Sequence, residues 1–198
     1  MDPQSHPHQL VLASSSPYRQ ALLARLCVPF ICIAPDVDEM TIAGEDTATS
    51  TERLALAKAE RVAGSVPEGF VIGSDQLAEF EGKSIGKPGS EERAVAQLMK
   101  FSGRSVNFHT SVAVVGQARG FRELVTVVTE VRFRTLSEQD ARAYVTLDQP
   151  LDCAGAFRSE AAGPLILEAM ISCDPTAIIG LPLIKLSGIL RNAGFKLP

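Results

Sequence analysis

The segment Leu10–Leu23 places a short apolar run directly before three serines, a proline and an amphipathic pattern. This order predicts a strand, a tight hydroxyl-rich loop and the first turn of a helix. Ser16 suits the N-cap, and Pro17 suits the first helical position, where its missing N–H costs nothing. Backbone N–H groups and the positive helix end then converge beside Arg19, an arrangement that favours a phosphate. The same pattern also fits an ordinary strand–turn–helix corner.

The composition limits the possible classes of protein. The chain has 198 residues, of which 45% are apolar, so it can bury a sizeable core as one domain or two close lobes. Its net charge of −4 argues against stable binding to nucleic acid. Met1–Gln9 holds no apolar signal segment, and no apolar run approaches ~18 residues. We therefore expect a cytoplasmic protein without membrane binding, with residues 1–8 as a flexible tail and residues 9–198 as one domain whose lobe boundary is not readable.

The cysteines show no C-x-x-C pair, and each has apolar neighbours. Reduced thiols buried in the core are expected at all of them, in a reducing compartment. They are Cys27, Cys32, Cys153 and Cys173.

Helical and strand patterns alternate along the chain, which predicts an α/β protein with a mixed sheet. The capping-box spacing of Thr49 and Glu52 marks the start of the second helix. Strands are expected at Leu10–Leu12, Pro29–Ala34, Gly69–Gly73, Asn107–Val115, Glu123–Arg134 and Leu165–Ser172, with a hairpin turn at Glu81–Lys83. Helices are expected over Pro17–Leu26, from Thr51 onward, and over Ser90–Lys100, Ser137–Leu147 and Leu181–Asn192.

Acidic side chains follow two of the expected strands. Asp75 comes after an apolar run, so we expect it at the carboxyl end of a strand, where ligands collect in open α/β sheets. Glu39 follows another strand in the same way. Carboxylates near a phosphate suit Mg²⁺ or Mn²⁺, because hard cations prefer oxygen ligands. Taken singly, Asp75 also fits a turn residue, and Lys58 and Lys87 fit solvated surface lysines.

Together these residues match a family pattern, because the chain resembles the Maf proteins, which are nucleoside triphosphate pyrophosphatases, over nearly its whole length. The landmarks that carry the resemblance, in the family's order, are Leu12-Ala13-Ser14-x-Ser16-Pro17-x-Arg19, Asp38-Glu39, Ala57-Lys58-Ala59, Gly73-Ser74-Asp75-Gln76, Gly86-Lys87-Pro88, Ser102-Gly103 and Gly180-Leu181-Pro182. The resemblance implies a Maf/ITPase-like elongated α/β fold, in which a twisted mixed β-sheet carries helices that form two lobes around a cleft. It also implies a possible homodimer.

The resemblance assigns a reaction and roles to individual residues. It implies hydrolysis between the α- and β-phosphates, which needs charge neutralisation and in-line positioning of water. Asp75 is implied as the catalytic proton acceptor and, with Glu39, as a ligand of Mg²⁺ or Mn²⁺. The implied phosphate-binding residues are Ser14, Ser16, Arg19, Lys58 and Lys87.

Base preference in the family tracks three positions, which here hold Tyr18, Gln76 and Glu160. The branch that prefers dTTP and UTP typically has arginine, threonine and glutamine there, and the branch that prefers 7-methyl-GTP has tryptophan, glutamine and glutamate. A cationic methylated guanine stacks well on an aromatic ring, and Glu160 can accept from the guanine N1–H and N2–H₂ groups. Tyr18 also fits a residue packed on the core, and Glu160 fits a solvated loop residue.

The resemblance therefore predicts an enzyme that hydrolyses 7-methyl-GTP to 7-methyl-GMP and pyrophosphate and removes modified nucleotides. One alternative is a pyrophosphatase of the same family that acts on dTTP or UTP. Another is a non-catalytic nucleotide-binding regulator of cell division.

Overall fold

The opening apolar run forms β1 (Leu10–Leu12), which pairs in parallel with β2 (Phe30–Cys32) and β3 (Phe70–Phe80). Beyond β3 the sheet becomes antiparallel, and its order is β2-β1-β3-β5-β6-β7, with β4 paired to the end of β3. The computed structural model describes residues 8–40, 42 and 44–197. The other strands are β4 (Lys83–Ile85), β5 (Ser105–Gly116), β6 (Phe121–Phe133) and β7 (Leu167–Ile171). The mixed sheet expected from the sequence is confirmed.

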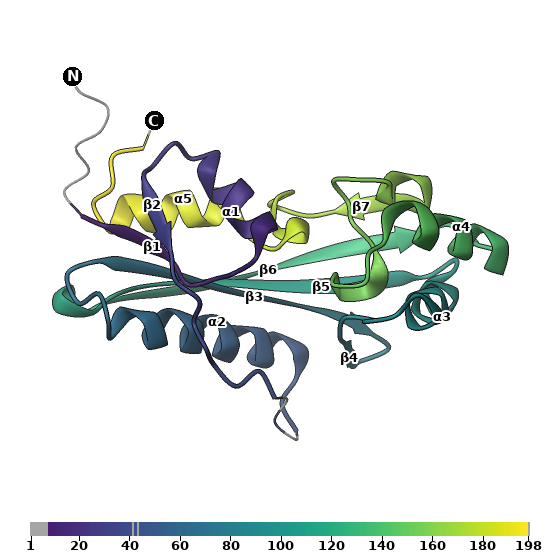
Figure 1. The fold of residues 1–198 in the computed structure, drawn as a ribbon, viewed down its shortest axis with the longest axis horizontal. Coiled ribbons are helices and arrows are strands. Elements are labelled where there is room, and N and C mark those ends of the chain that lie inside the picture. The colour runs from purple at the N-terminus through teal and green to yellow at the C-terminus, as the bar shows by residue number, and fades with distance from the viewer. Residues whose placement is uncertain (1–7, 41, 43, 198) are drawn as a thin grey trace.

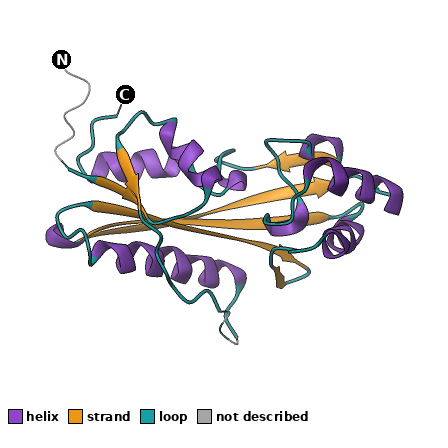
Figure 2. Ribbon diagram, viewed as in Figure 1, coloured by secondary structure: helices purple, strands orange, loops and turns teal. Residues whose placement is uncertain are grey.

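Helices cover both faces of this long sheet (Figure 1). The α-helices are α1 (Pro17–Ala24), α2 (Thr47–Ala63), α3 (Glu91–Phe101), α4 (Glu138–Asp148) and α5 (Leu183–Asn192). Short 3₁₀ turns are η1 (Gln117–Arg119), η2 (Ala154–Ala156), η3 (Gly163–Leu165) and η4 (Ala177–Ile179). Figure 2 shows that α2 lies along one face, whereas α1 and α5 lie over the other.

The alternation of side chains along the strands explains this layering. Phe70 and Ile72 of β3 are buried in one apolar cluster with leucines of α1 and α5. Val71, which lies between them, points to the opposite face and packs with alanines of α2. A third cluster lies at the far end of the sheet, where α3 and α4 cover Phe108 and Phe133. The long strands therefore connect two core regions, one at each end of the molecule.

Two of the sequence-based boundaries differ most from the structure. β3 does not end at Gly73 but continues through Asp75 to Phe80, because its polar residues pair with β5 in unbroken antiparallel register. α2 begins before the predicted Thr49 cap, since Asp46 Oδ1 accepts a hydrogen bond of 2.7 Å from the Thr49 backbone N–H. The earlier carboxylate caps the helix, so Thr49 lies inside it.

The cysteines are free, but most are not core residues. Cys27, Cys32 and Cys173 are exposed, and Cys153 is half-buried. The expectation of buried thiols is therefore wrong, because apolar neighbours in sequence do not bury a residue at a sheet edge such as β2 or in a loop.

Residues 1–7 of the expected tail lie outside the described residues. His8, the last tail residue in that expectation, has its ring 5.3 Å from the ring of Phe70. In the part of the chain that the structure describes, no helix has the length and apolar character needed to cross a membrane.

Gly73 controls how closely α2 approaches β3. A Cβ atom at Gly73 would lie 2.1 Å from the Ala55 carbonyl oxygen and 2.6 Å from the Ala59 nitrogen, both backbone atoms of α2. We expect Gly73→Ala to lower the free energy of unfolding by about 3 kcal/mol, because α2 must move away from the sheet. Urea unfolding followed by circular dichroism measures this change.

Gly188→Ala is the matched control for this prediction. Gly188 lies within α5, and a Cβ atom there would meet nothing within 4 Å. Alanine in an open helical position stabilises by roughly 0.5–1 kcal/mol. Equal urea midpoints for the two variants would contradict the close packing at Gly73.

Candidate functional site

A gap in the sheet creates the main cavity of the molecule. β1 ends at Leu12, and Ala13 N still donates to the Ile72 carbonyl oxygen at 2.8 Å. β4 pairs with β3 only from Ala78 onward. Among the described residues, the intervening edge of β3 therefore has no neighbouring strand on this side. A cavity of about 630 Å³ lies at this gap, a size that suits a small-molecule ligand.

The gap gives the cavity access to side chains from both faces of β3. Asp75 points toward α2, where it meets Lys58. The neighbouring Ser74 and Gln76 point to the other face and bond to the segment 177–180. In a fully paired strand such neighbours are separated by the sheet. Here Asp75 and Gln76 both line the same cavity.

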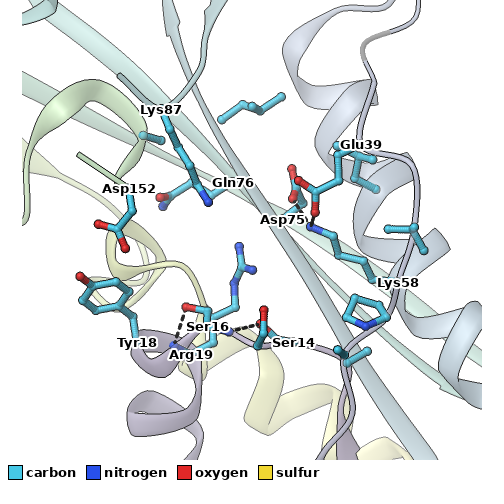
Figure 3. Close-up of a pocket in the computed structure, with 18 of the residues that line it drawn as sticks. Ser14, Ser16, Tyr18, Arg19, Glu39, Lys58, Asp75, Gln76, Lys87 and Asp152 are labelled. Carbon is cyan, nitrogen blue, oxygen red and sulfur yellow. Dashed lines mark hydrogen bonds and ion pairs between the residues drawn. The ribbon is translucent and has the colours of Figure 1, made fainter. Parts of the chain in front are cut away.

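Lys58 joins two carboxylates at one wall of the cavity (Figure 3). Its Nζ lies 2.7 Å from Asp75 Oδ1 and 2.6 Å from Glu39 Oε1. The side chain of Lys58 is 6% exposed and that of Asp75 is 9% exposed, whereas Glu39 is 59% exposed. Lys58 is therefore not a solvated surface lysine, and Asp75 is not a turn residue.

The electrostatic environment keeps Glu39 ionised. Partial burial opposes its ionisation, but the hydrogen bond and charge of Lys58 outweigh this effect and lower the pKa of Glu39. Lys87 and Arg19 add smaller contributions in the same direction. Glu39 therefore stays ionised at pH values somewhat below those at which a glutamate side chain ordinarily becomes protonated.

The serine loop forms the opposite wall and has the expected local structure. Ser16 is the N-cap of α1, and Pro17 occupies the first turn. Ser16 N donates to Ser14 Oγ at 3.1 Å, and Arg19 N donates to Ser16 Oγ at 3.4 Å. Figure 3 shows Ser14, Ser16 and Arg19 together on the side of the cavity formed by this loop. Hydroxyls and a helix N-terminus therefore face the carboxylate wall.

A distant segment fixes the orientation of Arg19. Its Nε donates to the Gly180 carbonyl oxygen at 2.9 Å, and Ser74 Oγ donates to the same oxygen at 2.9 Å. Burial lowers the pKa of Arg19, and the charges of Asp75 and Glu39 partly offset this effect. With Nε engaged, the terminal nitrogens of the guanidinium group are left to contact a ligand.

The charges around the cavity balance one another. Lys87, on the loop after β4, is exposed and lines the cavity without an ion pair among the described residues. Arg53 also lines it, but its charge is paired with Glu45 at 2.8 Å. The acidic lining residues are Asp36, Glu39, Asp75 and Asp152, and the basic ones are Arg19, Arg53, Lys58 and Lys87. A bound triphosphate would add several negative charges to this balanced set.

The residues proposed to read the base share a second, adjoining pocket of about 100 Å³. Tyr18, Gln76 and Glu160 all line it. Gln76 Nε2 donates to the carbonyl oxygens of Ala177 at 2.9 Å and Ile178 at 3.0 Å, which orients the amide. The Gln76 side-chain oxygen is therefore left as an acceptor. Tyr18 is half-buried and Glu160 is exposed, so each can meet a ligand.

The structure brings together every site residue expected from the sequence. Those of the cavity are Ser14, Ser16, Tyr18, Arg19, Glu39, Lys58, Asp75, Gln76 and Lys87. Sequence reasoning missed Arg53, Asp152 and the carbonyl group of Gly180. Arg53 precedes Lys58 by five residues on α2, which is a weak signal for a shared face. Gly180 belongs to a landmark of the family resemblance, but nothing in the sequence indicated its contacts with Arg19 and Ser74, which span more than 100 residues.

The carboxylates fit a shared metal ion but not a complete protein cage. Within the described ranges, no group of three or more His, Cys, Asp and Glu side chains is arranged to hold a metal ion. Lys58 contacts one oxygen each of Glu39 and Asp75, so the second oxygen of each remains available. Magnesium in phosphate-handling sites is commonly bound by one or two carboxylates plus substrate phosphates and water. The residues present fit that mode.

Comparisons with solved structures identify the fold. The chain has a TM-score of 0.55 to the Ham1 protein of Staphylococcus aureus, at 15% identity, covering 93% of this chain and 99% of that one. A HAM1 protein from Coxiella burnetii gives a TM-score of 0.51 at 16% identity, with the same coverage. The sheet and helices therefore form a Maf/ITPase-like fold.

Comparisons with sequences identify the family. A protein from Burkholderia orbicola named 7-methyl-GTP pyrophosphatase is 47% identical over 99% of this chain and 95% of its own length. Proteins of the same name from Albidiferax ferrireducens and Xanthomonas axonopodis are 47% and 45% identical, over 95% and 96% of this chain and 94% and 99% of their own lengths. The family model described as Maf-like protein matches residues 9–193. The chain therefore belongs to the Maf family.

Proposed function

We propose that this protein is a nucleoside triphosphate pyrophosphatase that hydrolyses 7-methyl-GTP to 7-methyl-GMP and pyrophosphate. The observation that carries the proposal is the cavity in which the Lys58-bridged pair of Asp75 and Glu39 faces the loop from Ser14 to Arg19. One wall offers carboxylates for activating water, and the other offers hydroxyl, amide and guanidinium groups for phosphates. The names of the relatives support the substrate class.

Asp75 is proposed to accept the proton of the attacking water. The water oxygen forms a bond to the α-phosphorus, the bond from this phosphorus to the bridging oxygen breaks, and pyrophosphate leaves. The proton goes to the carboxylate oxygen of Asp75 that Lys58 does not contact. Lys58 holds the other oxygen at 2.7 Å and so fixes the orientation of the base.

The phosphate-binding residues are proposed to hold the chain of phosphates in line for this attack. The positively charged side chains of Arg19 and Lys87 line the cavity, and Ser14 and Ser16 contribute hydroxyl and backbone groups (Figure 3). Glu39 would hold Mg²⁺ or Mn²⁺, which would supply charge neutralisation and lower the pKa of bound water. Asp75, the other expected ligand, would contact the ion through a water molecule, so its free oxygen stays available as the proton acceptor. Acidic and basic side chains balance in the cavity lining, so the lining has no excess positive charge to neutralise a triphosphate. This balance supports the proposal that a metal ion supplies the added positive charge.

The adjoining pocket is proposed to bind the methylated base. Tyr18 offers an aromatic face, and a cation over such a face gains roughly 0.5–2 kcal/mol. Glu160 accepts from the N1–H and N2–H₂ groups of guanine, and the Gln76 oxygen offers a further acceptor. A thymine or uracil ring would set its carbonyl oxygens against these acceptors. This chemistry favours guanine over the pyrimidines of the alternative dTTP and UTP substrates.

A direct substrate comparison tests the proposal. Pyrophosphate release is measured with Mg²⁺ or Mn²⁺ for 7-methyl-GTP, GTP, dTTP, UTP and CTP under identical conditions. We expect the highest kcat/KM for 7-methyl-GTP. Preference for dTTP or UTP would keep the pyrophosphatase class and overturn the base assignment. Absence of turnover with every nucleotide would favour a regulatory nucleotide-binding role.

Removing the charge of Glu160 is expected to weaken the preference for 7-methyl-GTP. Glu160→Gln replaces one acceptor oxygen with an amide donor that faces the guanine N–H groups, so kcat/KM for 7-methyl-GTP should fall about tenfold. The kcat/KM for UTP should stay the same or rise. Glu168→Gln, at an exposed position of β7 outside both pockets, is the matched control. An unchanged ratio of the two substrates would remove Glu160 from base recognition.

We also propose the compartment in which the protein acts, its cellular role and its assembly. The free cysteines, three of them exposed, suit the reducing cytoplasm. The acidic net charge suits free nucleotides rather than nucleic acid as the partner, and removal of modified nucleotides is the corresponding role. Residues 9–198 are proposed to fold as one domain with two lobes, and the protein is proposed to form a homodimer. Light scattering at several concentrations measures that assembly directly.

A further inference from the structure

Asp152 lies where the main cavity meets the base pocket. The residues that line both spaces are Ser16, Tyr18, Arg19, Gln76, Lys87, Asp152 and Ala154. Asp152 is the acidic side chain in this shared group. It follows α4 in the chain, and Figure 3 shows it beside Tyr18 and Lys87, across the cavity from Asp75 and Glu39. No role in the reaction proposed above involves it.

The carboxylate of Asp152 is available to a ligand. The residue is exposed, and it forms no ion pair with any lysine, arginine or histidine that the structure describes. The neighbouring Cys153 thiol lies 3.5 Å from Asp152 Oδ1 and is a weak donor. A carboxylate in this position therefore keeps most of its acceptor capacity for groups that enter the junction.

The loop that carries Asp152 is anchored by a buried hydrogen-bond network. Tyr144 on α4 donates from its hydroxyl group to Asp148 Oδ2 at 2.6 Å, and Arg158 N donates to the Tyr144 hydroxyl at 3.0 Å. The Arg158 guanidinium group also pairs with Asp148. On the other side, Gly89 N donates to the Leu151 carbonyl oxygen at 2.9 Å. These contacts hold the backbone before and after Asp152, so its carboxylate is presented at a fixed place.

The order of groups in a nucleotide determines what meets Asp152. Ser14 and Asp75, which line only the main cavity, are assigned to the phosphates and to the attacking water. The other phosphate-binding residues, Ser16, Arg19 and Lys87, line both spaces. Glu160, which lines only the small pocket, is assigned to the base. The sugar connects phosphates to base, so it must pass through the junction. Carboxylates commonly accept hydrogen bonds from ribose hydroxyl groups.

We propose that Asp152 binds the ribose hydroxyl groups of the nucleotide and makes the enzyme prefer ribonucleotides. This inference rests on the proposed function, because it takes the phosphate and base ends from that assignment. A hydrogen bond to a charged acceptor contributes about tenfold or more to binding, and the exposure of Asp152 favours the lower end of that range. The wild-type enzyme should therefore prefer 7-methyl-GTP to its 2′-deoxy or 3′-deoxy form by about tenfold in kcat/KM.

The test compares sugar and base discrimination in one set of variants. Asp152→Asn removes the charge with little change of shape, and it is expected to reduce the ribose preference to within about twofold. Its discrimination between 7-methyl-GTP and GTP should stay close to that of the wild type. Glu160→Gln is the matched control with the opposite expected pattern, since it should alter base discrimination and leave the ribose preference intact. Thermal unfolding checks that both variants fold.

Each outcome has a distinct meaning. Equal ribose preference in the wild type and Asp152→Asn would overturn the proposal, as would a wild type without any such preference. If Asp152→Asn loses both the ribose preference and the discrimination between 7-methyl-GTP and GTP, Asp152 interacts with the positive charge of the methylated base instead, and the proposal is overturned. If the wild type hydrolyses no nucleotide, the proposed function fails. Equilibrium binding of the α,β-methylene analogues of GTP and 2′-deoxy-GTP then still tests Asp152, with the same expected loss of preference.

Discussion

Replacing Asp75 with asparagine is expected to lower kcat by about 100- to 10,000-fold, the usual contribution of a positioned general base. Asparagine keeps the shape of the side chain and an oxygen that can accept from Lys58, but it cannot take a proton from water. Substrate affinity should change by only a few fold, because the phosphates are held mainly by Arg19, Lys87 and the serine loop. Steady-state turnover combined with equilibrium binding of a non-hydrolysable nucleotide separates the two effects.

Asp36→Asn is the matched control for this variant. Asp36 lines the same cavity and is exposed, and no part of the proposed reaction uses it. Its loss removes the same charge from the same space without touching the contact between Lys58 and Asp75. If both variants lose turnover equally, the effect belongs to the cavity's total charge and Asp75 is not the base. Full turnover in Asp75→Asn would exclude the role outright.

Replacing Lys58 with methionine is expected to damage both stability and activity. Lys58 is the cation between Asp75 and Glu39, and its side chain is 6% exposed. Without it the buried Asp75 carboxylate loses its partner, which should lower the free energy of unfolding by about 2–3 kcal/mol near neutral pH. The pKa of Glu39, which Lys58 lowers, should rise toward its ordinary value. Turnover should fall at least 100-fold, since the base is no longer oriented.

Lys87→Met tests the same change of charge at an exposed position. Lys87 lines both pockets and forms no ion pair among the residues that the structure describes. Its loss should raise KM without a measurable change in unfolding free energy. Urea unfolding and steady-state kinetics of the two variants are measured side by side. A Lys58→Met protein as stable as Lys87→Met would show that the buried ion group does not stabilise the fold.

The stability that Lys58 confers through Glu39 should depend on pH in a defined direction. The pKa of Glu39 is lowered in the folded protein, so its contribution is present above the ordinary pKa of glutamate. It is lost as the pH falls through the lower, folded value. The difference in unfolding free energy between the wild type and Lys58→Met should therefore shrink at acidic pH.

Local sequence signals predicted the elements whose structure depends on neighbouring residues. The serine loop, the Ser16 cap and Pro17 in the first turn were readable because capping is a short-range interaction. The predicted start of the fourth helix at Ser137 is confirmed for the same reason, because Ser137 and Asp140 form a capping box there. The alternation of helical and strand patterns likewise indicated the α/β class and the mixed sheet.

The gap in the sheet beside β3 could not be predicted from the sequence. Asp75 was expected at the end of a strand, but it lies in the middle of β3, and the cavity exists because β1 stops while β3 continues. Strand ends are set by pairing between distant segments, and the apolar run around Val71 gave no sign of the polar continuation. The anchoring of Arg19 by Gly180 depends on contacts of the same long range. The residue types of the site and the local structure of the serine loop were predictable, whereas the arrangement of segments distant in the sequence was not.

Analysis of the products formed from 7-methyl-GTP tests the central claim most directly. The wild-type protein is incubated with 7-methyl-GTP and Mg²⁺ in water enriched in ¹⁸O. The products are separated, and their masses are measured by mass spectrometry. Attack on the α-phosphorus predicts 7-methyl-GMP that carries the label, together with unlabelled pyrophosphate. Formation of 7-methyl-GDP and inorganic phosphate, or label in the pyrophosphate, would contradict the assigned bond cleavage and the placement of the water by Asp75.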